Sequence, residues 1–221
     1  KRINSEKGED VKETALKVLQ TVLTESKTVR FEGNNYSDDW KKEAAKRKLY
    51  IEDVTPKAIS YYQSQDCIEL FTSFNVLTER ECNSRTEIKY EAYATTKMVE
   101  IKIAVDILRT QILPNLKDHI IQAGAAFDTV ANINGSSDVF KEEIELFTEL
   151  YIRLKTDKRE LISFIDKVNA VESTYDRAID IATNGLDLLS KVRETVDKVE
   201  GLIADDLWGL PRYDELLTIN D

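Results

Sequence analysis

Residues that interrupt regular structure are scarce in this sequence. It contains seven glycines and three prolines among 221 residues. The tight turns that join short strands depend on these two residues, so a protein built from many short strands needs more of both. We therefore exclude a β-sandwich and expect long, uninterrupted helices.

Side chains that bind metals or act as nucleophiles are also scarce. The chain has two cysteines, Cys67 and Cys82, and one histidine, His119. A zinc site needs four ligands, and a di-iron site in a helical bundle needs two Glu-x-x-His pairs. Nothing in the sequence supports a catalytic pairing of either cysteine with His119, which we expect to be solvated. We predict that this chain contributes no catalytic residue, no cofactor-binding residue and no metal ligand.

Phosphate-binding loops and acid–base pairs are missing as well. The glycines stand singly, whereas a P-loop or a dinucleotide-binding turn needs them closely spaced. The carboxylate pairs Glu142/Glu143 and Asp205/Asp206 occur in segments rich in acidic residues. We expect these pairs to lie on a solvated helix surface.

The charge of the chain is negative and unevenly distributed. The formal net charge is −10, with 21 acidic and 20 basic residues in 1–137 but 20 acidic and 11 basic residues in 138–221. Such a surface repels nucleic acid and anionic membranes, and no basic stripe offsets it. No apolar run approaches the roughly 20 residues that cross a bilayer, and no signal peptide is evident. We expect a cytoplasmic protein without a nucleic-acid or membrane partner, and, because the sequence starts at Lys1, a piece of a longer chain.

Apolar residues recur at helical spacing along most of the chain. One helix is expected over residues 10–27, a short one after the N-cap Ser37, and one or two more over 56–74, with Thr55 as an N-cap before Pro56. Thr78 and Glu81 form a predicted capping box that opens a long helix, kinked but not ended at Pro114. Two further long helices, from about residue 137 and residue 174, are expected to pair as an antiparallel hairpin.

These helices predict an all-α fold, a bundle of long antiparallel helices with one proline kink and a smaller irregular helical part at the N-terminus. We expect residues 1–76 to form that irregular part and residues 77–221 to form the bundle with a docked C-terminal tail. Trp208, Tyr213 and Leu216 follow the end of the last helix, so these apolar groups need cover. We predict that the three contribute to a packing interface, on this domain or on a neighbouring subunit.

Four segments of the sequence resemble type III glutamine synthetases. They occur in the same order as in that family and span residues 28–219. They are Arg30–Trp40 with Glu43 and Arg47, Val76–Glu81 with Ser84, Arg85 and Glu87, Arg109–Pro114, and Ala204–Trp208 with Leu210, Pro211, Tyr213 and Glu215–Leu217.

The resemblance implies a cytosolic ligase, dependent on ATP and magnesium, that joins ammonia to glutamate in a large homo-oligomer. In that family the catalytic groups precede the stretch seen here, so the resemblance implies the non-catalytic C-terminal helical part of such an enzyme. Its expected partners are its own catalytic domain and sister subunits. The alternative is a stand-alone acidic helical module that binds other proteins and has no enzymatic activity.

Overall fold

The computed structural model describes residues 11–133 and 135–218, and no strand occurs among them. The all-α fold predicted from the sequence is confirmed. The chain divides into two compact units, residues 1–53 and residues 54–221. The division predicted at residue 76, between an irregular helical part and the long-helix bundle, stays a prediction.

The first unit contains the helix α1 (Val11–Glu25), the 3₁₀ turn η1 (Ser26–Val29) and the helix α2 (Asp38–Lys46). Ser37 caps α2 as predicted, because its hydroxyl accepts a hydrogen bond from the backbone N–H of Trp40. The rings of Phe31 and Trp40 lie 4.5 Å apart between centroids, and the Arg47 guanidinium lies over Phe31. A Cβ at Gly33 would come within 2.5 Å of the Phe31 ring, so a larger residue there would require this ring to move.

The second unit begins with three short elements, α3 (Thr55–Ser60), η2 (Tyr61–Gln63) and α4 (Gln65–Ser73), all packed against α5. The prediction that Thr55 caps α3 is wrong. Val54 occupies the N-cap position, and no side chain accepts a hydrogen bond there. Pro56 lies in the first turn, where its missing N–H leaves no bond unmade.

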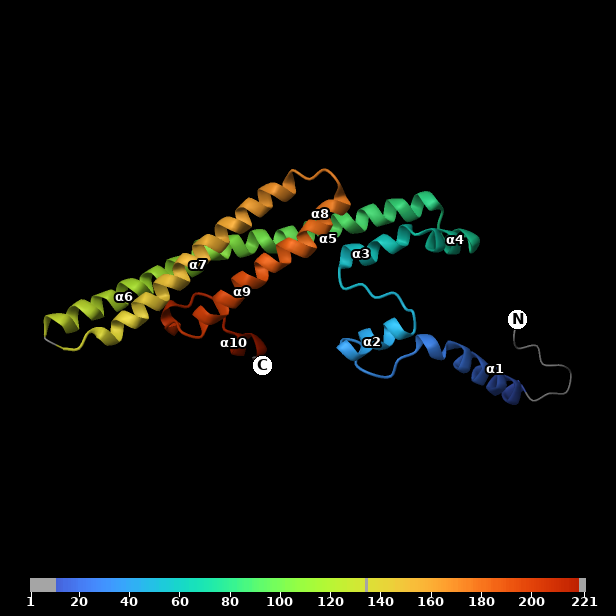
Figure 1. Cartoon of the computed structure of the whole chain (residues 1–221), viewed down its shortest axis with the longest axis horizontal. Coiled ribbons are helices and arrows are strands. Elements are labelled where there is room, and N and C mark those ends of the chain that lie inside the picture. The colour runs from blue at the N-terminus through green and yellow to red at the C-terminus, as the bar shows by residue number, and fades with distance from the viewer. Residues whose placement is uncertain (1–10, 134, 219–221) are drawn as a thin grey trace. The chain divides into compact units, whose positions relative to one another are not determined.

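A continuous helical stretch then runs from Glu79 to Asn132 (Figure 1). It consists of α5 (Glu79–Ile107), the π-helical turn η3 (Leu108–Ile112) and α6 (Leu113–Asn132). The capping box predicted at its start is present, with Thr78 and Glu81 hydrogen-bonded in both directions. Pro114 does not end the helix, as predicted. The π-helical turn η3 lies just before Pro114, and its altered backbone hydrogen bonding lets the helix continue although proline has no N–H to donate.

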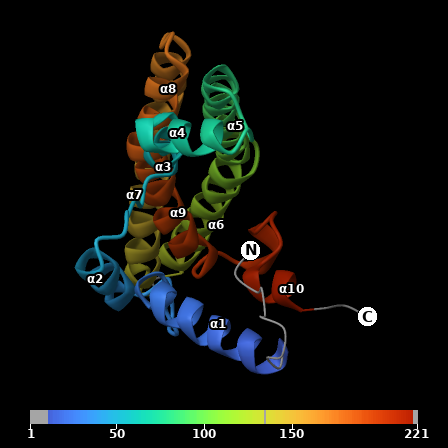
Figure 2. The ribbon, with the colours of Figure 1, turned by 90° about the vertical axis from the view of Figure 1, so that its right-hand side faces the viewer.

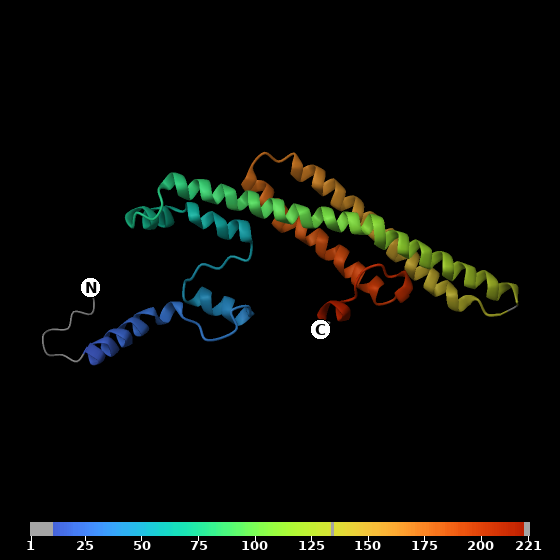
Figure 3. The ribbon, with the colours of Figure 1, turned by 180° about the vertical axis from the view of Figure 1, so that it is seen from behind.

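The last long helices form an antiparallel hairpin, which confirms the predicted pairing (Figures 1 and 3). They are α7 (Asp138–Asn169) and the segment made of α8 (Thr174–Asp180), η4 (Ile181–Gly185) and α9 (Leu186–Glu200). The second partner was expected to be one regular helix, but η4 is a π turn. A Cβ on Gly185 would lie 2.8 Å from the Phe164 ring, so the two helices approach closely here.

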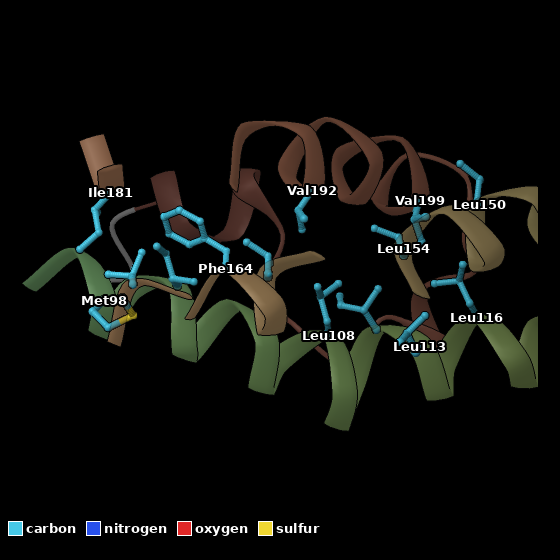
Figure 4. Packing of buried hydrophobic residues seen from close by; sticks show 14 of the residues in the cluster. Met98, Leu108, Leu113, Leu116, Leu150, Leu154, Phe164, Ile181, Val192 and Val199 are labelled. Atoms are coloured by element: carbon cyan, nitrogen blue, oxygen red, sulfur yellow. The ribbon is translucent and has the colours of Figure 1, made fainter. Parts of the chain in front are cut away.

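The core of the second unit lies between two sides of the bundle. Viewed along the bundle, α5 and α6 form one side and α7, α8 and α9 form the other (Figure 2). Leu108 and Leu116 point from the first side toward Leu154 and Val199 on the second (Figure 4). All four side chains are almost fully buried. Burial of apolar side chains such as these stabilises the bundle.

Candidate packing surface at the C-terminal tail

The C-terminal tail, residues 201–218, turns back beside the end of α9 (Figures 1 and 3). It contains the 3₁₀ turn η5 (Asp205–Leu207) and the short helix α10 (Tyr213–Leu217). Trp208 follows η5 and is only 8% exposed, as a member of the main core cluster. Trp208 therefore anchors the tail on its own unit, one of the two alternatives left open by the sequence.

Arg212 fastens the tail to the end of α9. Its guanidinium donates hydrogen bonds to the carbonyl oxygens of Glu200, at 2.6 Å, and Ile203, at 3.3 Å. Glu200 is the last residue of α9 and Ile203 follows it, at a helix end where backbone oxygens lack helical partners and a cation is favoured. The same guanidinium lies 2.5 Å from the Asp205 carboxylate. The tail is thus held by charge-assisted bonds as well as by the burial of Trp208.

An apolar groove of about 390 Å³ opens between this tail, α9 and the junction of α5 with η3. Leu189, Val192 and Val196 line it from α9, and Ile107 and Leu108 line it from the opposite helix. Trp208 and Leu216 line it from the tail. The indole N–H of Trp208 is buried and has no hydrogen-bond partner among the described residues. The groove is therefore mainly apolar, and charged side chains of α9 also line it.

The three predicted interface residues differ in their exposure and in whether their side chains are described. Trp208 is buried, whereas Leu216 is 65% exposed at the edge of the groove. The side chain of Tyr213 lies outside the part of the chain that is described. Trp208 and Leu216 thus meet at one groove, and their role in a contact with another subunit stays a prediction.

His119 is not solvated, and that prediction is wrong. Its side chain is 11% exposed, and its Nε2 atom lies 2.8 Å from an Oε1 atom of Glu143. Its ring also packs on Phe147, with centroids 3.9 Å apart. These contacts join α6 to α7. No local pattern in the sequence predicts these contacts, because His119 and Glu143 lie on different helices.

No group of three or more His, Cys, Asp and Glu side chains in 11–133 and 135–218 is arranged to hold a metal ion. Cys67 is half-buried on α4 and Cys82 is buried on α5, and both are free thiols. Within the same ranges no helix is both long and apolar enough to cross a membrane.

The four family-like segments build structural features of the fold. The first contains the turn of Gly33 and the N-cap of α2, and the second is the capping box of α5. The third contains the π turn before Pro114, and the fourth is the tail that carries Trp208. None of these contacts is an arrangement of an acid, a base and a nucleophile. The segments position helices and the tail.

Comparisons with known proteins agree that the chain is similar to glutamine synthetases. The family described as "Glutamine synthetase C-terminal domain" matches residues 14–125. A protein named "Type-3 glutamine synthetase" from Dictyostelium discoideum is 26% identical over 207 residues, which is 91% of this chain and 28% of the relative.

Two bacterial relatives match along nearly the whole chain. A "Glutamine synthetase" from Bacteroides fragilis (strain YCH46) is 26% identical over 96% of this chain and 30% of its own length. One from Butyrivibrio fibrisolvens is 26% identical over 98% of this chain and 31% of its own length. The chain thus spans less than a third of the length of these curated relatives.

Proposed function

Because the chain belongs to the glutamine synthetase C-terminal domain family, we propose that it is the non-catalytic helical part of a glutamine synthetase. In this proposal it packs against its own catalytic domain and against sister subunits of a cytoplasmic homo-oligomer. The parent joins ammonia to glutamate at the expense of ATP, with magnesium. The ATP and magnesium that take part in the reaction bind outside this segment.

The observation that carries the proposal is the structural role of the family-like segments. Similarity to glutamine synthetases extends over 91% to 98% of the chain. The segments that carry it form turns, caps and the tail, and the described residues contain no metal-binding group of His, Cys, Asp and Glu. Phosphoryl transfer from ATP needs carboxylates that hold metal ions near the phosphates. A packing role agrees with both observations.

The apolar face of α1 supports a role in packing. This helix has no buried residue, and Leu16 and Leu19 are 58% and 52% exposed. Apolar faces of this kind mark contact surfaces in soluble proteins. The curated relatives contain more than twice as much additional sequence, which supplies a partner for such a face. We assign α1 to the contact with the catalytic domain.

The groove at the C-terminal tail supports a second contact. It is apolar, and Leu216 and Leu217 beside it are 65% and 82% exposed. Exposed leucines next to an apolar hollow gain free energy when another surface covers them. We assign this groove to packing against a sister subunit.

The test is an assay of glutamine formation, run on this 221-residue chain and on the longer protein that contains it. Both are given the same ATP, magnesium, glutamate and ammonia. We expect activity from the longer protein and none from the chain alone. Turnover by the chain alone would contradict the non-catalytic assignment. A folded but inactive longer protein would favour the alternative, an acidic helical interaction module.

Assembly is tested separately in the longer protein. Leu216→Asp places a charge at the groove, and Leu146→Asp is the matched control on α7, where the leucine is 42% exposed and lies outside the groove. We expect Leu216→Asp to lower the oligomeric mass measured by sedimentation and Leu146→Asp to leave it unchanged. Equal masses for the two variants would remove the groove from the proposal.

A further inference from the structure

A second pocket in the bundle is basic, although the protein is strongly acidic. It has a volume of about 240 Å³ and lies between the start of α6 and the middle of α7, which run side by side (Figures 1 and 3). Four of its lining residues are cationic, namely Arg109, Lys117, Lys155 and Lys158. The net charge of the whole chain is −10, so the local charge is opposite to that of the protein.

Each of the two helices brings its basic residues to the pocket by helical spacing. Arg109 and Lys117 are eight residues apart across η3 and α6, and Lys155 and Lys158 are three residues apart on α7. Residues at these spacings lie on one face of a helix. Because the two helices pack together, the two pairs line the same hollow.

Most of this positive charge has no acidic partner. Arg109 pairs with Asp106, at 2.7 Å, and both groups are largely exposed. Lys117, Lys155 and Lys158 form no ion pair with any residue in the described part of the chain. Asp157 lies between two of them in sequence, but the charged groups that act on its carboxyl are Arg153, Glu160 and Lys191. Three of the four cationic side chains that line the pocket therefore have no ion-pair partner among the described residues.

Tyr151 adds an aromatic wall and a hydroxyl. The Lys155 ammonium lies 5.8 Å from the centroid of the Tyr151 ring, close enough for a cation–π contact that restrains this lysine. The tyrosine hydroxyl can donate a hydrogen bond to an oxyanion. The pocket thus offers ammonium and hydroxyl donors on one concave surface.

Like charges held together repel, and an anion bound among them removes that cost. Ammonium groups bind phosphate oxygens as point charges, without the fixed geometry that arginine imposes. The volume is below the roughly 300–1,000 Å³ of sites for drug-sized ligands, so the hollow suits an inorganic anion or one end of a larger molecule.

We propose that the pocket formed by Arg109, Lys117, Tyr151, Lys155 and Lys158 binds a small, multiply charged phosphate anion. The shared chemistry is that of phosphate oxygens, which inorganic pyrophosphate and the phosphate groups of a nucleotide both provide. The inference rests on this pocket and does not depend on the proposed function.

The test is calorimetric titration of the 221-residue chain with inorganic pyrophosphate and, in a second series, with ATP, at ionic strength held constant with potassium chloride. We expect saturable binding of pyrophosphate by the unchanged chain. The double variant Lys155→Gln/Lys158→Gln should bind it at least about tenfold more weakly, since one hydrogen bond to a charged group corresponds to about a factor of ten. Lys117→Gln, on the other helix, should weaken it as well.

The matched control is Lys102→Gln/Lys141→Gln, which removes the same charge from exposed positions on α5 and α7 outside the pocket. Its affinity should stay within about twofold of the unchanged chain, because salt screens charges beyond roughly 10 Å. ATP binding tighter than pyrophosphate would assign the anion to a nucleotide, and equal or weaker binding would assign it to an inorganic anion.

Two results would overturn the proposal. Equal weakening by the pocket variant and the control would show a general charge effect. Absence of saturable pyrophosphate binding would overturn it outright, and salt-dependent self-association that the pocket variant abolishes would then assign the lysines to an acidic face of a second copy. Circular dichroism of each variant confirms that the helices remain folded, since all the substituted lysines lie at or near the surface.

Discussion

The helices α1 and α7 both have an apolar stripe, but only one of the two stripes is covered. On α7, Phe147, Leu154 and Leu161 are almost completely buried against the rest of the bundle. On α1 no residue is buried, and Leu19 is 52% exposed. A stripe at helical spacing predicts that a helix has an apolar face. It does not predict which part of a protein covers that face.

The bundle and α1 therefore differ in what covers their apolar faces. The bundle covers its own stripes, so its stability depends on contacts within the chain. The stripe of α1 is accounted for, in our proposal, by a catalytic domain that this chain does not contain. Substitutions in the two regions should therefore have different effects in the 221-residue chain.

The largest difference should come from removing one leucine in each helix. Leu154→Ala leaves a cavity at a fully buried position, and we expect it to lower the free energy of unfolding by about 3–4 kcal/mol. Leu19→Ala, the matched change on α1, should alter it by less than about 0.5 kcal/mol. Urea unfolding followed by circular dichroism measures both. Equal losses would mean that α1 is already covered within this chain.

A glycine pair tests how closely the bundle helices approach. Gly185→Ala places a methyl group 2.8 Å from the Phe164 ring, and we expect a loss of about 1–3 kcal/mol. At Gly201 an added Cβ would lie 3.7 Å from its nearest neighbours, an ordinary contact. Gly201→Ala should therefore be neutral or stabilising by up to about 1 kcal/mol. Thermal unfolding measures the stability of both variants. A Gly185→Ala protein as stable as the unchanged chain would contradict the close approach of the two helices.

Removing the arginine clamp should loosen the tail and leave the bundle folded. Arg212→Gln loses the bonds to the Glu200 and Ile203 carbonyls, and we expect a cost of about 1–2 kcal/mol. In a Trp40→Phe background Trp208 is the only tryptophan, so its fluorescence reports on the tail. We expect emission at longer wavelength in the arginine variant. Unchanged emission would show that the burial of Trp208 alone holds the tail.

The smallest effect concerns Asp157 on α7. Burial raises the pKa of this carboxyl above its ordinary value of 3.8, and Oδ2 has no hydrogen-bond partner in the described residues. The folded chain therefore keeps the proton over a pH range above 3.8 in which the unfolded chain has lost it. The free energy of unfolding falls as the pH rises through that range and stays reduced at neutral pH.

We expect Asp157→Asn to stabilise the chain at pH 7 by about 0.5 kcal/mol or less, because solvent screens a partly exposed group. This gain in stability should vanish at a pH below 3.8, the ordinary pKa of an aspartate carboxyl. Asp180 is the matched control. Burial alone would raise its pKa, but hydrogen bonds from Lys167 and Asn184 outweigh burial and lower it. Asp180→Asn should therefore destabilise the chain at pH 7. Thermal unfolding at several pH values tests both signs.

Local signals in the sequence were sufficient for helix starts and for the hairpin. Ser37 and the Thr78/Glu81 box are confirmed because a capping bond joins residues three positions apart. Thr55 failed as an N-cap because Val54 and Pro56 shift the start of α3 by one residue. The π turn that ends at Gly185 was not predicted, and the close approach of Phe164 to Gly185 joins residues that are distant in sequence.

The two surfaces differ in how far the sequence could predict them. The sequence predicts Trp208, Tyr213 and Leu216 as packing residues because apolar groups after a helix end need cover, and Trp208 and Leu216 line the groove. The basic pocket was not predicted, because Lys117 and Lys155 come from different helices and each has an acidic residue close to it in the sequence. The contact of His119 with Glu143 was missed for the same reason. Such sites form where two helices pack together, and the sequence does not show which helix faces meet.

Hydrogen exchange of the backbone amides in α1 is the measurement that tests the central claim most directly. It is made on the 221-residue chain and on the longer protein that contains it, with α7 as the internal reference. We predict fast exchange of α1 in the chain alone, slow exchange of α1 in the longer protein, and slow exchange of α7 in both. Equally fast exchange of α1 in both proteins would contradict the account, because the apolar face of α1 would then have no partner in the parent enzyme.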